Sequence, residues 1–283
     1  MAATRIDAHQ HVWNLDRVAY PWLTPVYGPL YRNFEPPELA PQLRAAGIER
    51  TVLVQAANSY ADTDDMLRQA DTYDWIGAVV GWVPLPQPEE VGQVLDRYAR
   101  HPKFRGVRHL IHEEADPDWV VQDRVIEGLR VLAARGLLFE MVAVFPHHLK
   151  HVPTLAERVP DLTIVIDHLA KPPIKDGAME PWATQLAAAA HYPNVYAKVS
   201  GLNTAADPAT WSAADLKPYI DSALDHFGAD RLMFGSDWPV CLLAGDYATV
   251  WAETNRALEG RPWPEIDAVL GGTAARVYNI TER

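Results

Sequence analysis

The chain lacks several features that would place it outside the cytoplasm. Cys241 is its only cysteine, so no intrachain disulfide can form and nothing requires an oxidising compartment. No apolar run approaches the roughly 18 residues of a membrane span. The first residues, Met1 to Asp7, do not contain the apolar core of a signal peptide. We therefore expect a cytoplasmic protein that does not bind a membrane.

Basic residues are also scarce. The 283 residues include 25 Lys and Arg against 37 Asp and Glu, which gives a net charge of −12. This deficit argues against a protein that binds nucleic acid through its phosphate groups. A small-molecule substrate is the expected partner, and the oligomeric state has no sequence signature.

What the chain does have is an alternation of short β-rich runs with amphipathic stretches. The runs are almost continuously apolar, which is typical of parallel strands covered on both faces. The predicted strands are 4–9, 51–56, 76–83, 104–110, 138–144, 162–167, 195–199 and 231–235. The predicted helices between and after them are 37–46, 62–73, 88–100, 123–135, 148–158, 181–191, 216–227 and 247–258.

Eight strand–helix pairs predict a closed (β/α)₈ TIM-like barrel, with residues 1–283 as a single domain. The alternative is an open Rossmann-type sheet, which we rank lower because no G-x-G-x-x-G follows the first strand. Residues 262–277 predict an extra C-terminal helix packed outside the barrel.

One connection, residues 13–36, is much longer than the others and rich in aromatic side chains. A loop of this length in a compact domain is usually functional, and after a barrel strand it lies over the C-terminal face. Its aromatic rings either pack on a sugar ring or only plug the barrel mouth. The sequence leaves both interpretations open.

Polar side chains gather where the predicted strands end, which in a barrel is the catalytic face. Two histidines one residue apart on an extended chain, His9 and His11, share one face. His-x-His alone is a weak motif. Its weight comes from coincidence with the other polar residues at strand ends: Arg108, His109, Glu140, Asp167, His168, Lys198, Ser236 and Asp237.

These motifs resemble the amidohydrolase superfamily, in particular its branch of L-fuconolactonase-type sugar-acid lactonases. The most specific segment is Arg231–Val240, RLMFGSDWPV. Further support comes from 6–11 (IDAHQH), 20–22 (YPW), 80–82 (VGW), 106–109 (GVRH), 167–172 (DHLAKP), 198–201 (KVSG) and 271–276 (GGTAAR). The pattern of the two-metal amidohydrolases is absent from the sequence.

The resemblance implies hydrolysis of a small sugar-acid lactone by water that a general base activates. Asp237 is the expected base, and its protonated form would then serve the leaving alkoxide. His9, His11 and His168 either hold one divalent metal together with Asp237 or donate hydrogen bonds to the carbonyl oxygen. Zinc is the most suitable ion for these ligands, and a metal-independent enzyme is the alternative.

The remaining candidates are assigned to substrate binding: Arg108, His109, Trp22, Trp82, Lys171, Lys198 and Trp238. Arg108 and His109 are equally suited to salt bridges at the barrel mouth, and Lys198 to a buried ion pair with Glu140 or Asp167. Cys241 has no recognisable base and is assigned to packing.

Three other functions are compatible with the same barrel. One is decarboxylation of an aromatic or unsaturated carboxylic acid, and another is isomerisation of a lactone by a substrate hydroxyl. The third, a catalytically silent binding barrel, does not explain why the histidines and Asp237 are kept together.

Overall fold

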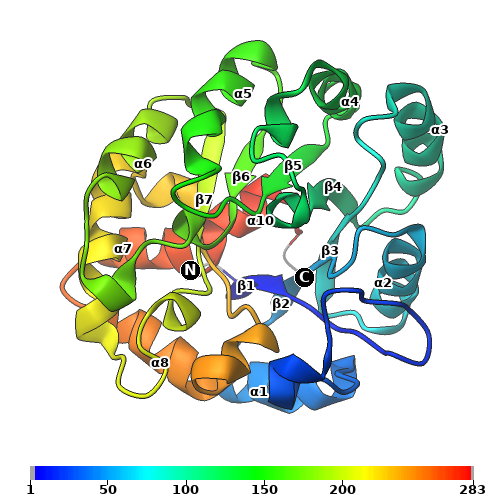
Figure 1. The fold of residues 1–283 in the computed structure, drawn as a ribbon. Helices are drawn as coiled ribbons and strands as arrows, with labels where there is room; N and C mark the ends of the chain where they lie inside the picture. Colours follow the sequence, from blue (N-terminus) through cyan, green and yellow to red (C-terminus); the bar gives the residue numbers. More distant parts are fainter. Residues whose placement is uncertain (1–3, 282–283) are drawn as a thin grey trace.

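The computed structural model describes residues 4–281, and eight parallel strands form its centre (Figure 1). Each strand pairs with the next one along the chain, in the order β1 to β8. Their bounds are β1 Ile6–Gln10, β2 Arg50–Val54, β3 Ile76–Gly81, β4 Phe104–His109, β5 Leu138–Met141, β6 Ile164–Ile166, β7 Val195–Val199 and β8 Leu232–Phe234. The predicted strands are thereby confirmed, with each lying inside or within a residue of its expected range.

A ring of helices surrounds the strands, as Figure 1 shows. These are α1 Pro36–Ala46, α2 Tyr60–Thr72, α3 Pro88–Tyr98, α4 Asp123–Ala133, α5 Val152–Arg158, α6 Trp182–Ala190, α7 Ala213–Phe227 and α8 Tyr247–Ala257. The helix expected at 148–158 begins four residues later, because a 3₁₀ turn at Leu149–His151 precedes it. The (β/α)₈ barrel expected from the sequence is confirmed.

The barrel closes just beyond the end of β8. The amide of Asp237 donates to the carbonyl of His9 (2.8 Å), and the amide of His11 donates to the carbonyl of Trp238 (2.7 Å). Nearby, a Cβ on Gly235 would lie 2.5 Å from that of His9, so glycine permits this close approach. Closure therefore places Asp237 directly beside His9 of β1 and His11, which follows the strand.

The C-terminal segment differs from the single helix expected at 262–277. It forms α9 Trp263–Asp267, a π turn at Ala268–Gly272 and α10 Thr273–Val277. A Cβ on Gly271 would lie 1.9 Å from the carbonyl oxygen of Thr4, so the segment bends where it crosses the start of the chain. Tyr278 and Ile280 then pack against Ile6 and other apolar residues of the strands, covering the amino-terminal end of the barrel.

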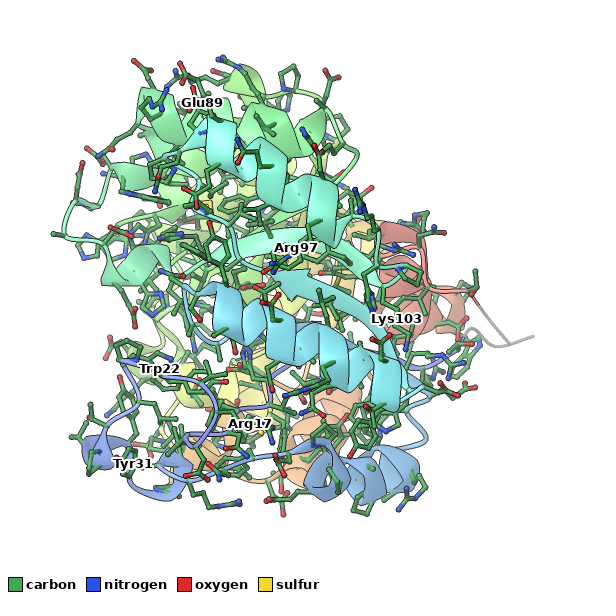
Figure 2. All side chains as sticks on the ribbon, turned by 90° about the vertical axis from the view of Figure 1, so that its right-hand side faces the viewer. Arg17, Trp22, Tyr31, Glu89, Arg97 and Lys103 are labelled. Carbon is green, nitrogen blue, oxygen red and sulfur yellow. The ribbon has the colours of Figure 1, made fainter. Side chains whose placement is uncertain are left out.

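The long connection after β1 is partly core and partly rim. Trp13, Tyr20 and Phe34 are buried, with the ring of Trp13 5.4 Å from that of Phe34. Trp22 is half-buried and Tyr31 exposed, and both lie at the end of the barrel away from α10 in Figure 2. The buried side chains belong to the core, as the plug interpretation expects, while contact of the rim residue Trp22 with a sugar ring stays a prediction.

Within residues 4–281, none of the helices is both long and apolar enough to cross a membrane. Met1 to Ala3, part of the segment tested for a signal peptide, lie outside the described residues.

Candidate active site

A cavity of about 320 Å³ opens among the carboxyl ends of the strands. This volume suits a small molecule, and the C-terminal face is where barrel enzymes hold their substrates. Charged and apolar side chains share its wall. The lining residues are His11, Trp22, Tyr27, Ala56, Arg108, Leu110, His112, Glu113, Val142, Val144, His168, Lys171, Asp237 and Val240.

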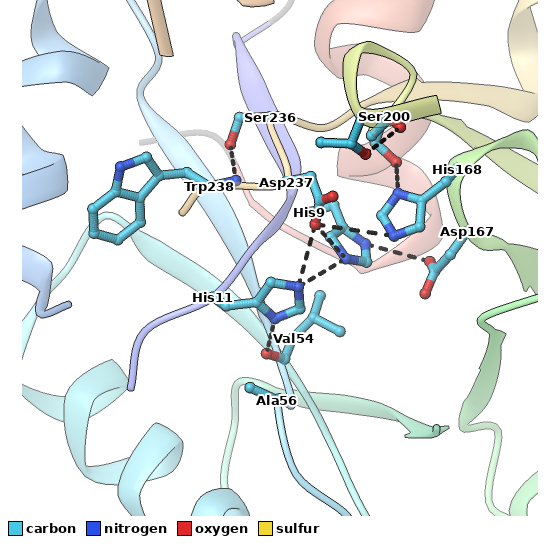
Figure 3. Close-up of polar contacts among 12 residues, drawn as sticks. His9, His11, Val54, Ala56, Asp167, His168, Ser200, Ser236, Asp237 and Trp238 are labelled. Atoms are coloured by element: carbon cyan, nitrogen blue, oxygen red, sulfur yellow. Dashed lines mark hydrogen bonds and ion pairs between the residues drawn. The ribbon is translucent and has the colours of Figure 1, made fainter. Parts of the chain in front are cut away.

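Three buried imidazoles surround one carboxylate oxygen at this cavity (Figure 3). The Oδ1 atom of Asp237 lies 3.5 Å from Nε2 of His11, 3.7 Å from Nε2 of His9 and 4.0 Å from Nε2 of His168. The Nε2 atoms of His9 and His11 are 3.2 Å apart. The structure therefore brings together the four residues that the sequence assigned to catalysis and metal binding.

Burial keeps these histidines neutral, because desolvation disfavours the imidazolium form. It lowers the pKa of His9 well below its ordinary value, lowers the pKa of His11, and lowers the pKa of His168 to about 3. Nδ1 of His11 lies 2.8 Å from the carbonyl oxygen of Val54, which can only accept. The neutral ring therefore carries its proton on Nδ1 and presents the lone pair of Nε2 to Asp237.

Asp237 is held as a carboxylate. Burial alone would raise its pKa, but the surrounding imidazoles of His168 and His11 and the charge of Lys171 outweigh burial and lower the pKa below its ordinary value. The side chain is 2% exposed. A permanently ionised carboxylate is thus available beside the cavity at neutral pH.

The backbone that presents these groups adopts an uncommon conformation. His168, Leu169, Ala170 and Lys171 have φ angles of 55°, 47°, 61° and 54°, and Asp237 has a φ of 58°. Left-handed conformations cost L-residues about 1–2 kcal/mol each and normally occur singly. Strain of this kind concentrates at functional sites. Here it directs three charged or titratable side chains of two loops into one cavity.

A glycine, Gly201, is needed where the segment after β7 passes these residues. Its φ is +56°, and a Cβ would lie 2.7 Å from Nδ1 of His168 and 2.9 Å from Oδ2 of Asp237. Any side chain at this position would therefore displace His168 and Asp237.

Beneath the histidines lies a second polar cluster built around Lys198, which is fully buried. Its Nζ atom is 2.6 Å from Oε2 of Glu140, 3.0 Å from Nδ1 of His9 and 3.4 Å from Oδ1 of Asp167. His9, Glu140 and Asp167 have the spacing of metal ligands, but the ammonium group already lies among them. Lys198 is thus the cation of this cluster, and the buried pair weighed for it in the sequence is formed.

The two carboxyl partners of Lys198 have pKa values shifted in opposite directions. Burial raises the pKa of Glu140 to about 7, although Lys198 opposes the shift, and the Tyr278 hydroxyl donates to this carboxyl at 2.5 Å. Burial would also raise the pKa of Asp167, but Lys198 and His9 hold it well below its ordinary value. Asp167 in turn accepts from Nη1 of Arg108 at 3.2 Å.

Four residues assigned to substrate binding do not reach the cavity wall: Trp82, His109, Lys198 and Trp238. His109 stacks on Trp119 with ring centroids 4.1 Å apart. Its Nδ1 accepts from Trp82 (3.0 Å), and its Nε2 lies 2.7 Å from a carboxylate oxygen of Glu114. Because Nδ1 accepts and burial lowers its pKa, the ring is neutral, and His109 is held at the barrel mouth by hydrogen bonds to Trp82 and Glu114.

Arg108, Lys171 and Trp22 do line the cavity, together with residues that the sequence did not single out. Among these, His112 and Glu113 belong to a 3₁₀ turn after β4, and Val142 and Val144 follow β5. These residues could have been found from the sequence because they come directly after strand ends. The same rule had already been applied to the polar residues.

Trp22 offers a test of the long loop. Its indole donates to the carbonyl of Ala56 (2.6 Å) and its ring contacts that of Tyr27 with centroids 5.2 Å apart. We expect Trp22→Ala to raise KM about 10-fold for a sugar lactone, because aromatic contacts contribute about 0.5–1.5 kcal/mol beyond burial. The melting temperature should change little, since the ring is only half-buried.

Steady-state kinetics and thermal melting measure both quantities, and Tyr31→Ala is the matched control because Tyr31 belongs to the same loop but not to the cavity wall. A lower melting temperature with unchanged KM would show that Trp22 only plugs the barrel.

The spacing of the three imidazoles and Asp237 fits a metal ion. A tetrahedral zinc ion with bonds of about 2.0–2.1 Å keeps its ligands about 3.3–3.4 Å apart. The distances among Nε2 of His9, Nε2 of His11 and Oδ1 of Asp237 are 3.2–3.7 Å. His168 joins His9 and Asp237 in a group whose ligand atoms all lie within 4.8 Å of one another. The side chains are therefore suited to one divalent ion.

Comparison with known proteins places this barrel in a family. A model of the amidohydrolase family matches residues 6–280, so the chain belongs to the amidohydrolases. A protein named L-fucono-1,5-lactonase from Burkholderia ambifaria is 40% identical, over 98% of this chain and 96% of that protein.

Solved structures agree with this assignment. A crystal structure of a Burkholderia multivorans amidohydrolase with bound zinc superposes with a TM-score of 0.90 at 38% identity, covering 99% of this chain and all of that one. The 5-carboxyvanillate decarboxylase of Sphingomonas paucimobilis has a TM-score of 0.68 over 99% of this chain and all of that one but only 15% identity, so it shares the fold alone.

Proposed function

We propose that this chain is a lactonase that hydrolyses a sugar-acid lactone resembling L-fucono-1,5-lactone. The observation that carries the proposal is the buried Asp237 carboxylate, surrounded by three neutral imidazoles at a cavity of small-molecule size. The 40% identity to an L-fucono-1,5-lactonase supports the substrate class.

Ester hydrolysis needs a base for the attacking water and positive groups for the oxyanion. Asp237 accepts the proton of the water as it attacks the lactone carbonyl. Arg108, which also lines the cavity, is held by Asp167 and by the carbonyl of Gln55 (2.5 Å), so its charge is fixed before substrate binds. A charge fixed in advance stabilises the tetrahedral oxyanion without reorganisation.

We further infer that His9, His11 and Asp237, with His168 as fourth ligand, hold one divalent ion, most suitably zinc. When bound, the ion would supply a Lewis acid and lower the pKa of the attacking water, which suits a base whose own pKa is low. The hydrogen bond of Nδ1 of His11 to Val54 orients the ring as ligand-supporting contacts do.

Substrate binding is assigned to the mixed wall of the cavity. Arg108 and Lys171 face the sugar oxygens, while Trp22 and the valines at 142 and 144 pack on its C–H faces. The other residues assigned to substrate binding lie behind the cavity wall and hold the loops and His9 in place. They are Trp82, His109, Lys198 and Trp238.

A panel of aldonolactones tests the function. We expect the protein to release acid from a 1,5-lactone, followed with a pH indicator after the spontaneous rate is subtracted. Decarboxylation of an aromatic acid would instead release carbon dioxide and consume a proton, and isomerisation would leave a lactone as product. Carbon dioxide release without action on any lactone would contradict the proposal.

A further inference from the structure

We propose that Lys171 is the acid that protonates the ring oxygen of the lactone as it leaves. This inference rests on the proposed lactonase activity and assigns a second proton transfer within it. Asp237 serves the attacking water, and a separate group then serves the departing alkoxide.

The backbone aims Lys171 at the reacting centre. The left-handed run from His168 to Lys171 closes with a hydrogen bond from the amide of Lys171 to the carbonyl of His168 (2.8 Å). Positions three apart in such a turn lie on the same side, and both side chains line the cavity together with Asp237. The chain thus adopts an unfavourable conformation that brings an ammonium group beside the imidazole and the carboxylate.

The ammonium group is available for chemistry. Its single hydrogen bond to a described side chain is to the Thr204 hydroxyl, at 3.0 Å. That hydroxyl donates to the carbonyl of Gly201 (3.0 Å), so it accepts from Lys171 and fixes its direction. Across residues 4–281, Lys171 has no carboxylate within salt-bridge distance, whereas Lys198 is bound between Glu140 and Asp167.

The chemistry of ring opening requires such a group. Water adds to the carbonyl carbon and gives one proton to Asp237. The bond between the carbonyl carbon and the ring oxygen then breaks, and the electron pair stays on the oxygen as an alkoxide. An alkoxide is a poor leaving group unless it is protonated as it departs. Lys171 donates that proton, and the neutral amine recovers it from the protonated Asp237, so lactone and water yield the hydroxy acid.

Changing the leaving atom tests this role. We compare an aldono-1,5-lactone with its ring-sulfur analogue, because a thiolate leaves readily without a proton. The variants are Lys171→Met, Lys171→Arg, and Lys175→Met as control, since Lys175 is exposed four residues away. Thermal melting establishes that each variant is folded.

We expect Lys171→Met to lower kcat for the oxygen lactone on the order of 10²–10⁴-fold, with KM changed little. The same variant should lower kcat for the thiolactone less than about 10-fold, since no proton is needed. Lys171→Arg should stay as slow as the methionine variant on the oxygen lactone, because a guanidinium keeps the charge but does not give up a proton.

Equal loss of kcat on both substrates would overturn the proposal in favour of a positioning role. Recovery in the arginine variant would overturn it in favour of charge alone, and an effect confined to KM would make Lys171 a binding residue. Failure of the unaltered protein to open either lactone would instead contradict the proposed function itself.

Discussion

Asp237→Asn should lower kcat for the lactone on the order of 10²–10⁴-fold, the usual effect of removing a general base. The amide is nearly the same size as the carboxylate but cannot accept a proton from water. Asp237 is buried and surrounded by imidazoles. No other described carboxylate occupies the same part of the cavity wall. The exposed Glu113 is the one other acidic residue of that wall.

Initial rates measure the loss, and circular dichroism with thermal melting establishes that the fold is retained. Asp161→Asn is the control, because Asp161 is exposed and not part of the cavity wall. Near-native kcat in the Asp237 variant would show that another group activates the water.

Removal of metal is expected to have the second large effect. Exhaustive chelation should abolish most turnover, and zinc should restore it, because the Nε2 atoms of His9 and His11 and the Oδ1 atom of Asp237 have the spacing of ligands around one ion. Metal content should approach one ion per chain, since the ammonium group of Lys198 already lies in the neighbouring cluster.

The His11→Ala variant should neither bind zinc nor regain turnover when zinc is added. The His226→Ala variant, altered on the exposed face of α7, should do both. Elemental analysis and activity are measured on the same samples. Full activity in a chain free of metal would contradict the Lewis-acid role and show that the histidines are not obligatory metal ligands.

Much of this site follows from position along the chain. Parallel strands of a barrel end at one rim, so residues that follow different strands meet there whatever their separation in sequence. This rule selected His9, His11, His168 and Asp237 among other polar residues, the family resemblance assigned them their roles, and they converge in the structure. The loop residues His112 and Glu113 obey the same rule but carry no motif that distinguishes them.

The sequence did not settle which of two neighbouring polar residues would face the cavity. Arg108 and His109 are adjacent on β4, and side chains on a strand alternate between faces. Arg108 lines the cavity, while His109 is held by Trp82, Trp119 and Glu114. Those partners come from other segments, and their positions depend on how the loops pack.

By itself, then, the sequence determined the barrel and the rim on which its chemistry lies, because apolar periodicity and strand order are local properties of the chain. Only the tertiary structure decided the roles of the two lysines, since a charge depends on what surrounds it. Lys198 is bound between Glu140 and Asp167, whereas the left-handed turn leaves Lys171 facing the cavity with one hydroxyl partner. Two residues of the same type thereby have different chemistry, because packing among the described residues brings carboxylates within salt-bridge distance of Lys198 and not of Lys171.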